Sequence, residues 1–181
     1  FQTDFQQDVK ANYKSPWAVG FGAGYFLEHT QFHFSAEWYD AVDGYDVLEL
    51  ENFRSQATGE IVDRSIRQKS DEVFNIAIGA QQDFGETYGG FLSFNTDQSS
   101  FNEESDISVT GFDIYHLTGG GSAAVGRTNW MLGISYSWGS EQVTQLIDLE
   151  PGDDGDVTDP ENLVNLNYSR ITFMFGFRVG L

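Results

Sequence analysis

Three polar residues in the segment "HFSAE" have the side-chain types that a hydrolase uses. If this segment is a strand, His33, Ser35 and Glu37 share one face, because successive side chains of a strand point to opposite faces. Side chains two residues apart on a strand stand about 6.5 to 7 Å apart. That separation is too large for the direct hydrogen bond between a nucleophile and its base. We therefore predict no catalytic residues and no enzymatic activity.

The acidic stretch "GDDGDVTDPE", residues 152–161, is the best candidate for cation binding. Its spacing does not match the calcium loop of an EF-hand, and clustered acids usually form a solvated loop. The absence of cysteine removes disulfides and thiolate metal sites. The glycine-rich stretch "TGGGSAAVG" follows a predicted strand but precedes no helix, so it is no phosphate cradle. We predict no metal site and no cofactor.

Alternating apolar residues define the elements that must position any functional side chain. In "RITFMFGFRVGL", residues 170–181, every odd position is apolar, whereas the even positions are polar, glycine or methionine. A period of two identifies a β-strand. Its wholly apolar side must press against a protein core or against lipid.

The segment "NWMLGISYSWG" distinguishes these two environments. Trp130, Leu132, Ile134, Tyr136 and Trp138 share one face, opposite small residues that would fill a soluble core poorly. Large side chains on one face and small or polar ones on the other favour a lipid-facing barrel wall. The alternative is that the tryptophans belong to the core of a soluble β-sandwich.

Aromatic residues near the strand ends predict two membrane girdles. Trp130 and Trp138 are eight residues apart, which at a tilt of about 40° separates them by roughly 20 Å in height, against an apolar band of about 25 Å. The predicted girdle residues are Trp17, Tyr25, Trp38, Trp130 and Trp138.

Seven antiparallel strands are predicted, and the connections between them alternate between short and long. Short periplasmic turns and long outer loops are typical of outer-membrane barrels. We expect the first strand to continue through Pro16 with a kink. We also expect a bulge in the stretch "VTGFDIYHLTGG", because Phe112 and Ile114 lie on one parity and Tyr115 and Leu117 lie on the other. The predicted ranges are 5–26, 30–41, 71–83, 86–97, 107–120, 128–140 and 163–181, with long polar loops at about 41–70, 97–106 and 140–162.

Composition excludes two classes of protein. A formal net charge of −19 would repel a phosphate backbone, so we predict no binding to nucleic acid. No run approaches the roughly 18 to 20 apolar residues that a spanning helix needs.

The order of these segments resembles the carboxyl-terminal half of the FadL/TodX family of outer-membrane transporters. The resemblance is carried by "YKSPWAVGFGAGYFLEHTQFHFSAEWYDAVDGYDVLE", "DEVFNIAIGAQQDFGETYGGFLSFNTDQ", "YHLTGGGSAAVGRTNWMLGISYSWG" and the last strand. It implies that residues 1–181 form a single barrel region, half of a fourteen-stranded transmembrane β-barrel in the outer membrane of a Gram-negative bacterium. It further implies passive diffusion of long-chain fatty acids or other hydrophobic compounds. The family's amino-terminal half, with its plug-like hatch and its kinked exit strand, is not in this sequence.

Side chains opposite the apolar ladders are predicted to line the barrel interior. We expect Arg170 and Arg178 each to pair with a luminal carboxylate, although a fatty acid's head group would also suit such a cation, and Phe91 and Met174 to meet its tail. The predicted lining residues are His33, Glu37, Tyr39, Asn75, Phe91, Asn95, His116, Arg170, Met174 and Arg178. The predicted partners are outer-membrane lipid and lipopolysaccharide, a hydrophobic ligand or detergent, and either other protein subunits or the amino-terminal half.

Two other functions remain open from the sequence. A relative of the family can serve as a structural or interaction subunit of a secretion or surface complex in the outer membrane, with its acidic loops as the docking surface. A small, water-filled porin is the third reading.

Overall fold

The structure is a computed structural model that describes residues 7–55, 57–106, 111–144 and 163–180. The chain divides into two compact units. The first comprises Phe1–Val19, Trp38–Phe74 and Ser100–Gly111. The second comprises Gly20–Glu37, Asn75–Ser99 and Phe112–Leu181. The described residues contain no helix that is long and apolar enough to cross a bilayer.

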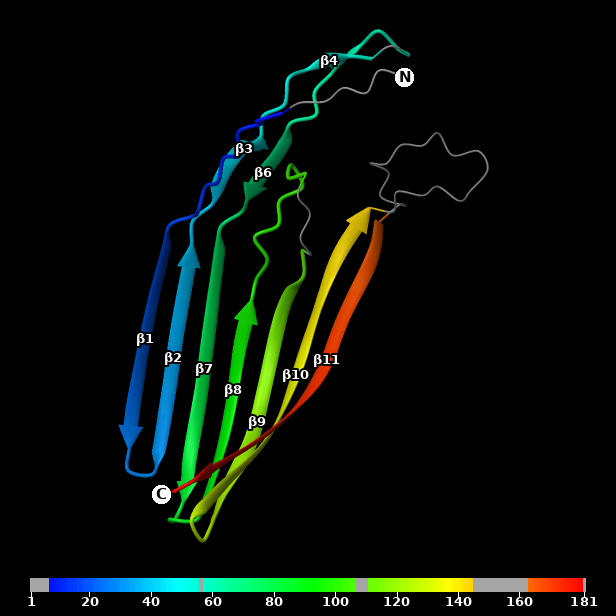
Figure 1. The fold of residues 1–181 in the computed structure, drawn as a ribbon. Coiled ribbons are helices and arrows are strands. Elements are labelled where there is room, and N and C mark those ends of the chain that lie inside the picture. The colour runs from blue at the N-terminus through cyan, green and yellow to red at the C-terminus, as the bar shows by residue number, and fades with distance from the viewer. Residues whose placement is uncertain (1–6, 56, 107–110, 145–162, 181) are drawn as a thin grey trace. The chain divides into compact units, whose positions relative to one another are not determined.

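A seven-stranded sheet forms the second unit, and three of its strands run on into the first (Figure 1). Its order is β1-β2-β7-β8-β9-β10-β11, and the strands from β7 to β11 pair antiparallel with their neighbours. The all-β prediction is therefore confirmed, with seven strands in the main sheet. The strands are β1 (Ala18–Leu27), β2 (Thr30–Tyr39), β7 (Val73–Phe84), β8 (Tyr88–Asp97), β9 (Asp113–Val125), β10 (Thr128–Thr144) and β11 (Leu163–Val179).

The sheet ends at β1 and β11, and no pairing among the described residues joins these two strands. A closed barrel is therefore not found among the described residues. Both edge strands present backbone donors and acceptors that no described strand satisfies.

The apolar ladders of β10 and β11 lie on one face of the sheet, as their period of two predicts. Cross-strand partners share a face, and Trp130 pairs with Phe177, Ile134 with Phe173. These side chains are not buried between two sheets, because Phe173 is 80% exposed and Leu132 is 63% exposed. We call this side the apolar face, which also carries Leu92 and Phe94 of β8, Tyr115 and Leu117 of β9, and Ile78 of β7.

The short connections of the sheet, at 28–29, 85–87 and 126–127, all lie at one end (Figure 1), and the connections that alternate with them along the chain are longer. Glu28, Gly85 and Gly126 have positive φ angles of 47°, 71° and 63°, which let the chain reverse within two or three residues. The predicted alternation of short and long connections is confirmed.

Two details of the predicted strands are wrong. The first strand begins at Ala18, after Pro16; before it, Ala11 only bridges to Leu48, and the Asn12 N–H donates to the Val47 carbonyl at 2.9 Å. Apolar parity continued through the proline, but proline has no N–H to give to a ladder. The register of β9 also runs from residue 113 to 125 without a bulge.

The first unit contains two small sheets in a segment that we expected to be a solvated loop. One joins β3 (Val42–Leu48) to β6 (Ile66–Ser70), and the other joins β4 (Phe53–Arg54) to β5 (Ile61–Val62). Within the described residues the buried apolar side chains are Tyr45 and Val73. A polar segment with few apolar residues has therefore folded around very little core.

Hydrogen bonds replace apolar packing in this unit. The Tyr45 hydroxyl accepts from the Lys14 backbone N–H at 3.1 Å and donates to Gln68 Oε1 at 3.0 Å. The Lys14 ammonium lies 4.8 Å from the centre of the Tyr45 ring. Lys69 donates to Glu104 at 2.7 Å, and this hydrogen bond lowers the pKa of the Glu104 carboxyl.

We expect Tyr45→Phe to loosen the first unit locally by about 1–2 kcal/mol, because it removes two hydrogen bonds from a buried hydroxyl and leaves the ring in place. Hydrogen exchange of the backbone amides in β3 and β6 measures this change. Tyr13→Phe is the control, since Tyr13 is 85% exposed. Equal exchange in the two variants would contradict the structural role of the Tyr45 hydroxyl.

Candidate functional site

The face opposite the apolar ladders is organised in rows that run across the strands. Antiparallel register places one residue of each strand in every row, with all side chains of that row on the same face. Three successive rows on β8, β9, β10 and β11 contain different kinds of side chain. They are Asn95–His116–Ser137–Arg170, then Ser93–Thr118–Ser135–Thr172, then Phe91–Gly120–Gly133–Met174.

The first of these rows contains a hydrogen-bonded serine and histidine. His116 Nδ1 lies 2.8 Å from Ser137 Oγ, and Ser137 is only 5% exposed. A hydroxyl this buried is shielded from substrate, so we interpret the pair as a tie between β9 and β10. In the next row Thr118 Oγ1 donates to Ser135 Oγ at 2.8 Å and ties the same two strands. Sequence reasoning missed both ties, because 21 and 17 residues separate the partners.

The third row is apolar and is built around two glycines. A Cβ atom on Gly120 would lie 2.6 Å from Phe91 Cζ, and one on Gly133 would lie 3.3 Å from the same atom. Met174 Cε lies 3.0 Å from that second position. Phe91 therefore rests on the backbone of both glycines, and Met174 approaches from the next strand. Phe91 and Met174, which the sequence placed on one face, come together here.

Two hollows on this face show that the sheet bends toward it. One, of about 370 Å³, is lined by residues of all strands from β7 to β11. In a flat sheet, four steps of about 4.8 Å would hold β7 and β11 roughly 19 Å apart, so the sheet must curl to close one hollow over both. The other, of about 700 Å³, extends to β1 and β2. We call this side the concave face; Gln81, Phe91 and Met131 line both hollows.

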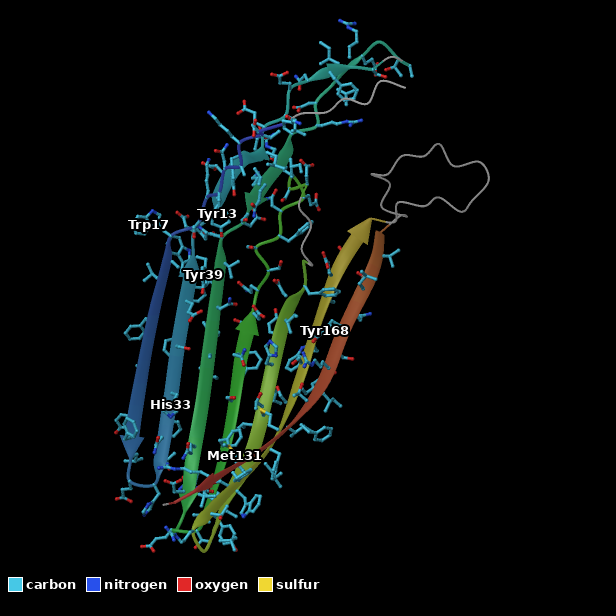
Figure 2. All side chains as sticks on the ribbon, viewed as in Figure 1. Tyr13, Trp17, His33, Tyr39, Met131 and Tyr168 are labelled. Atoms are coloured by element: carbon cyan, nitrogen blue, oxygen red, sulfur yellow. The ribbon has the colours of Figure 1, made fainter. Side chains whose placement is uncertain are left out.

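The remaining predicted lining residues occupy different positions. His33 lines the larger hollow and packs edge-on against Phe26 at 6.3 Å between ring centres; Figure 2 labels His33 and Met131. Glu37 lies over Gly20, with its Cγ 3.9 Å from where a Cβ would be. Asn75 Oδ1 accepts from Thr96 and from the Gln98 N–H at 3.2 and 2.8 Å. Tyr39 belongs to the first unit and is 37% exposed.

Both arginines of β11 point to the concave face, where Arg178 pairs in register with Asn129 and Arg170 with Ser137. The predicted ion pairs are absent from the described part of the chain, where the ion pair found is Lys69–Glu104. Arg178 lines the smaller hollow. A cation without a carboxylate partner among these residues is available to an anionic ligand.

Aromatic side chains gather in two clusters on the apolar face. Trp130 lies 5.7 and 5.6 Å from Phe175 and Phe177, measured between ring centres. Trp138 lies 5.9 Å from Tyr115 and 5.4 Å from Tyr136. The two clusters are eight residues apart along β10, which is the spacing that predicted two girdles. Of the other girdle residues, Tyr25 is 65% exposed near the short-turn end of β1, and Trp17 and Trp38 belong to the first unit.

The described residues contain no group of three or more histidine, aspartate or glutamate side chains that could hold a metal ion. The acidic stretch at residues 152–161 lies outside the described residues. No family model, curated protein or solved structure matches this chain.

Proposed function

We propose that this chain is one half of a FadL-like, fourteen-stranded outer-membrane β-barrel that lets hydrophobic small molecules diffuse passively across the membrane. One observation carries the proposal: a single antiparallel sheet has an exposed apolar face on one side and a hollowed face of small, polar and a few apolar side chains on the other. A lipid-exposed barrel wall has this division.

Contact with lipid explains the exposed ladder of large side chains. In water, exposed side chains such as Phe173, Phe175 and Phe177 would cost about 25 cal/mol for every Å² of apolar surface. In a bilayer the same surface meets hydrocarbon, and the two aromatic clusters fall near its two interfaces. Outer-membrane lipid and lipopolysaccharide are thus the proposed surroundings.

The open edges of β1 and β11 explain why half a barrel needs its counterpart. In hydrocarbon, each unsatisfied backbone donor or acceptor costs several kcal/mol. Seven further strands, pairing with β1 on one side and with β11 on the other, would remove both edges. In this arrangement the short turns face the periplasm and the long connections face outward.

Uptake into vesicles made of phospholipid and lipopolysaccharide tests the proposal with the full-length protein. We expect a hydrophobic fluorescent compound to enter faster than it enters protein-free vesicles, without an ion gradient, and sucrose to stay out. Gly22→Phe is expected to slow uptake severalfold, because the glycine lines the larger hollow and its nearest obstacle to a Cβ is 3.8 Å away. Val19→Phe is the control, since residues three apart on a strand point to opposite faces and Val19 does not line the hollow.

Equal uptake by the two variants would contradict passage along the concave face. Rapid entry of sucrose would instead support a water-filled porin.

The folded first unit favours a second candidate function, an interaction subunit of an outer-membrane complex. Its two small sheets and the buried Tyr45 order a segment that could have been a disordered loop. A partner protein that co-purifies with the wild type but not with a variant lacking residues 50–64, together with no uptake, would support this function over transport.

A further inference from the structure

The apolar face of the sheet ends at the same level on four strands, at the end opposite the short turns. Side chains in one row share a face, so the change can be followed row by row from β8 to β11. The successive rows are Phe94–Leu117–Tyr136–Ile171, then Thr96–Tyr115–Trp138–Ser169, then Asp113–Ser140–Asn167, and then Gln142–Asn165. Apolar and aromatic side chains thus give way within two rows to hydroxyl, amide and carboxylate groups.

The sheet extends beyond the apolar face at this end only. β10 continues six residues past Trp138, to Thr144, and stays paired with β11 (Figure 1). At about 3.3 Å per residue and a tilt of about 40°, this ribbon rises roughly 15 Å above Trp138. At the other end Trp130 lies two residues from Thr128, where β10 begins. An outer membrane has the same asymmetry, because the sugars of its glycolipid lie on the outer surface only.

Aromatic rings with similar orientation mark the boundary between the apolar and the polar rows. The angle between ring planes is 15° for Phe94 and Tyr115, and 28° for Tyr115 and Trp138. It is 19° for Tyr136 and Trp138. The face of an aromatic ring is electron-rich and attracts the weakly positive C–H groups of a sugar ring. Rings that lie nearly parallel can therefore offer their faces to one sugar.

The polar rows above these rings have groups that suit sugar hydroxyls rather than phosphates. Asn165, Asn167 and Gln142 are exposed, and an amide both donates and accepts hydrogen bonds, as a sugar hydroxyl does. The described residues of these rows include no lysine or arginine. Asp113 accepts from the Ser99 N–H at 3.0 Å. Its carboxylate can also accept from a hydroxyl, whereas it repels a phosphate.

We propose that this surface binds the sugar head group of an outer-leaflet glycolipid, with a sugar ring on Tyr115 and Trp138 and its hydroxyls on Asn165, Asn167 and Gln142. Lipopolysaccharide is a lipid of this class. The inference rests on the proposed function, because it requires this end of the sheet to face outward. It gives the outer wall of the barrel a preference for one lipid, separate from the hollows of the concave face.

Native mass spectrometry of the full-length protein in an amine-oxide detergent, which carries no sugar, tests the head group. The probes are lipopolysaccharide truncated to its inner core, the same lipid after phosphatase treatment, and phosphatidylglycerol. We expect lipopolysaccharide to bind roughly tenfold more tightly than phosphatidylglycerol, because ring stacking and hydrogen bonds add to the contacts of the acyl chains. Removal of its phosphates should not weaken binding.

Two tryptophan variants test the position of the site. Trp138→Leu is expected to weaken lipopolysaccharide binding roughly fivefold, because it removes a ring on which the sugar stacks. Trp130→Leu is the matched control, since it makes the same change on the same strand and face at the opposite end, and it should leave binding unchanged.

The amides are tested by the double variant Asn165→Ala with Asn167→Ala. Loss of two hydrogen-bonding groups should weaken lipopolysaccharide binding roughly fivefold and leave phosphatidylglycerol binding unchanged. Leu166→Ala is the control, since Leu166 lies between the two on the opposite face. The proposal is overturned if phosphatidylglycerol binds as tightly as lipopolysaccharide, if removal of the phosphates abolishes binding, or if the two tryptophan variants bind equally.

Glycolipid binding and vesicle uptake are separate measurements, so this surface and the transport function can fail independently. Uptake without a preference for lipopolysaccharide would refute the surface but not transport. A preference that depends on Trp138, in a protein that gives no uptake, would refute transport but not the surface.

Discussion

Phe173→Lys is expected to destabilise the membrane-inserted protein by about 2–4 kcal/mol, the cost of a lysine facing lipid at the middle of a bilayer. Phe173 pairs with Ile134, which lies four residues from both Trp130 and Trp138, and its side chain is 80% exposed on the apolar face. It therefore stands midway between the two aromatic clusters. Urea titration of the full-length protein in liposomes, followed by tryptophan fluorescence, measures the loss.

Two further lysine variants test face and depth separately. Thr172→Lys places the same charge one residue away on the concave face, where we expect a change within about 0.5 kcal/mol. Phe177→Lys stays on the apolar face but at the level of Trp130, where the cost should fall to about 0–1 kcal/mol. An equal loss of stability in all three lysine variants would mean that the apolar face does not contact hydrocarbon.

Gly120→Ala should destabilise the sheet by about 1–3 kcal/mol, as overpacking of a filled site does. Its added Cβ would overlap the Leu132 carbonyl oxygen and would lie 2.6 Å from Phe91 Cζ and 2.8 Å from Gly133 Cα. Two of these three atoms are backbone of β10, so the strand itself must move. The same urea titration measures the effect.

Gly119→Ala is the matched control, because that glycine points to the apolar face and its nearest neighbour, Leu92 Cδ1, is 3.4 Å away. The double variant Gly120→Ala with Phe91→Ala removes the ring but not the clash with the Leu132 oxygen, so it should stay less stable than Phe91→Ala alone. If Gly120→Ala lowers the stability of the protein no more than Gly119→Ala does, the close packing of β9 against β10 described above is wrong.

Strand type and facing were predictable because they are local properties of the sequence. Alternation in β10 and β11 placed Trp130 and Phe177 on one face before any pairing was known, and the structure pairs them. The hydrogen bond between His116 and Ser137 was not predictable in this way, since it depends on the register that the turn at Gly126 sets between β9 and β10. The contacts of the Phe91 ring with Gly120 and Gly133 were not predictable either, because they depend on the register of three strands, β8, β9 and β10.

The first unit was missed for a different reason. Its strands carry few apolar residues. Tyr45 is held by hydrogen bonds to Lys14 and Gln68, which no periodic pattern in the sequence predicts. The opposite error occurred before Ala18, where alternation continued without a strand. Alternation alone is thus insufficient where the chain has no neighbouring strand with which to pair.

If the proposed function is right, the unpaired edges of β1 and β11 matter before the chain reaches a membrane. β11 combines an open hydrogen-bonding edge with a ladder of exposed phenylalanines, which is the combination that promotes aggregation in water. In that case a chain that inserts slowly into lipid would need a chaperone to cover β11 while it is in aqueous solution. Such a chaperone would not have to recognise a particular sequence. It would have to bind an extended segment that carries exposed aromatic side chains and has an unpaired backbone edge.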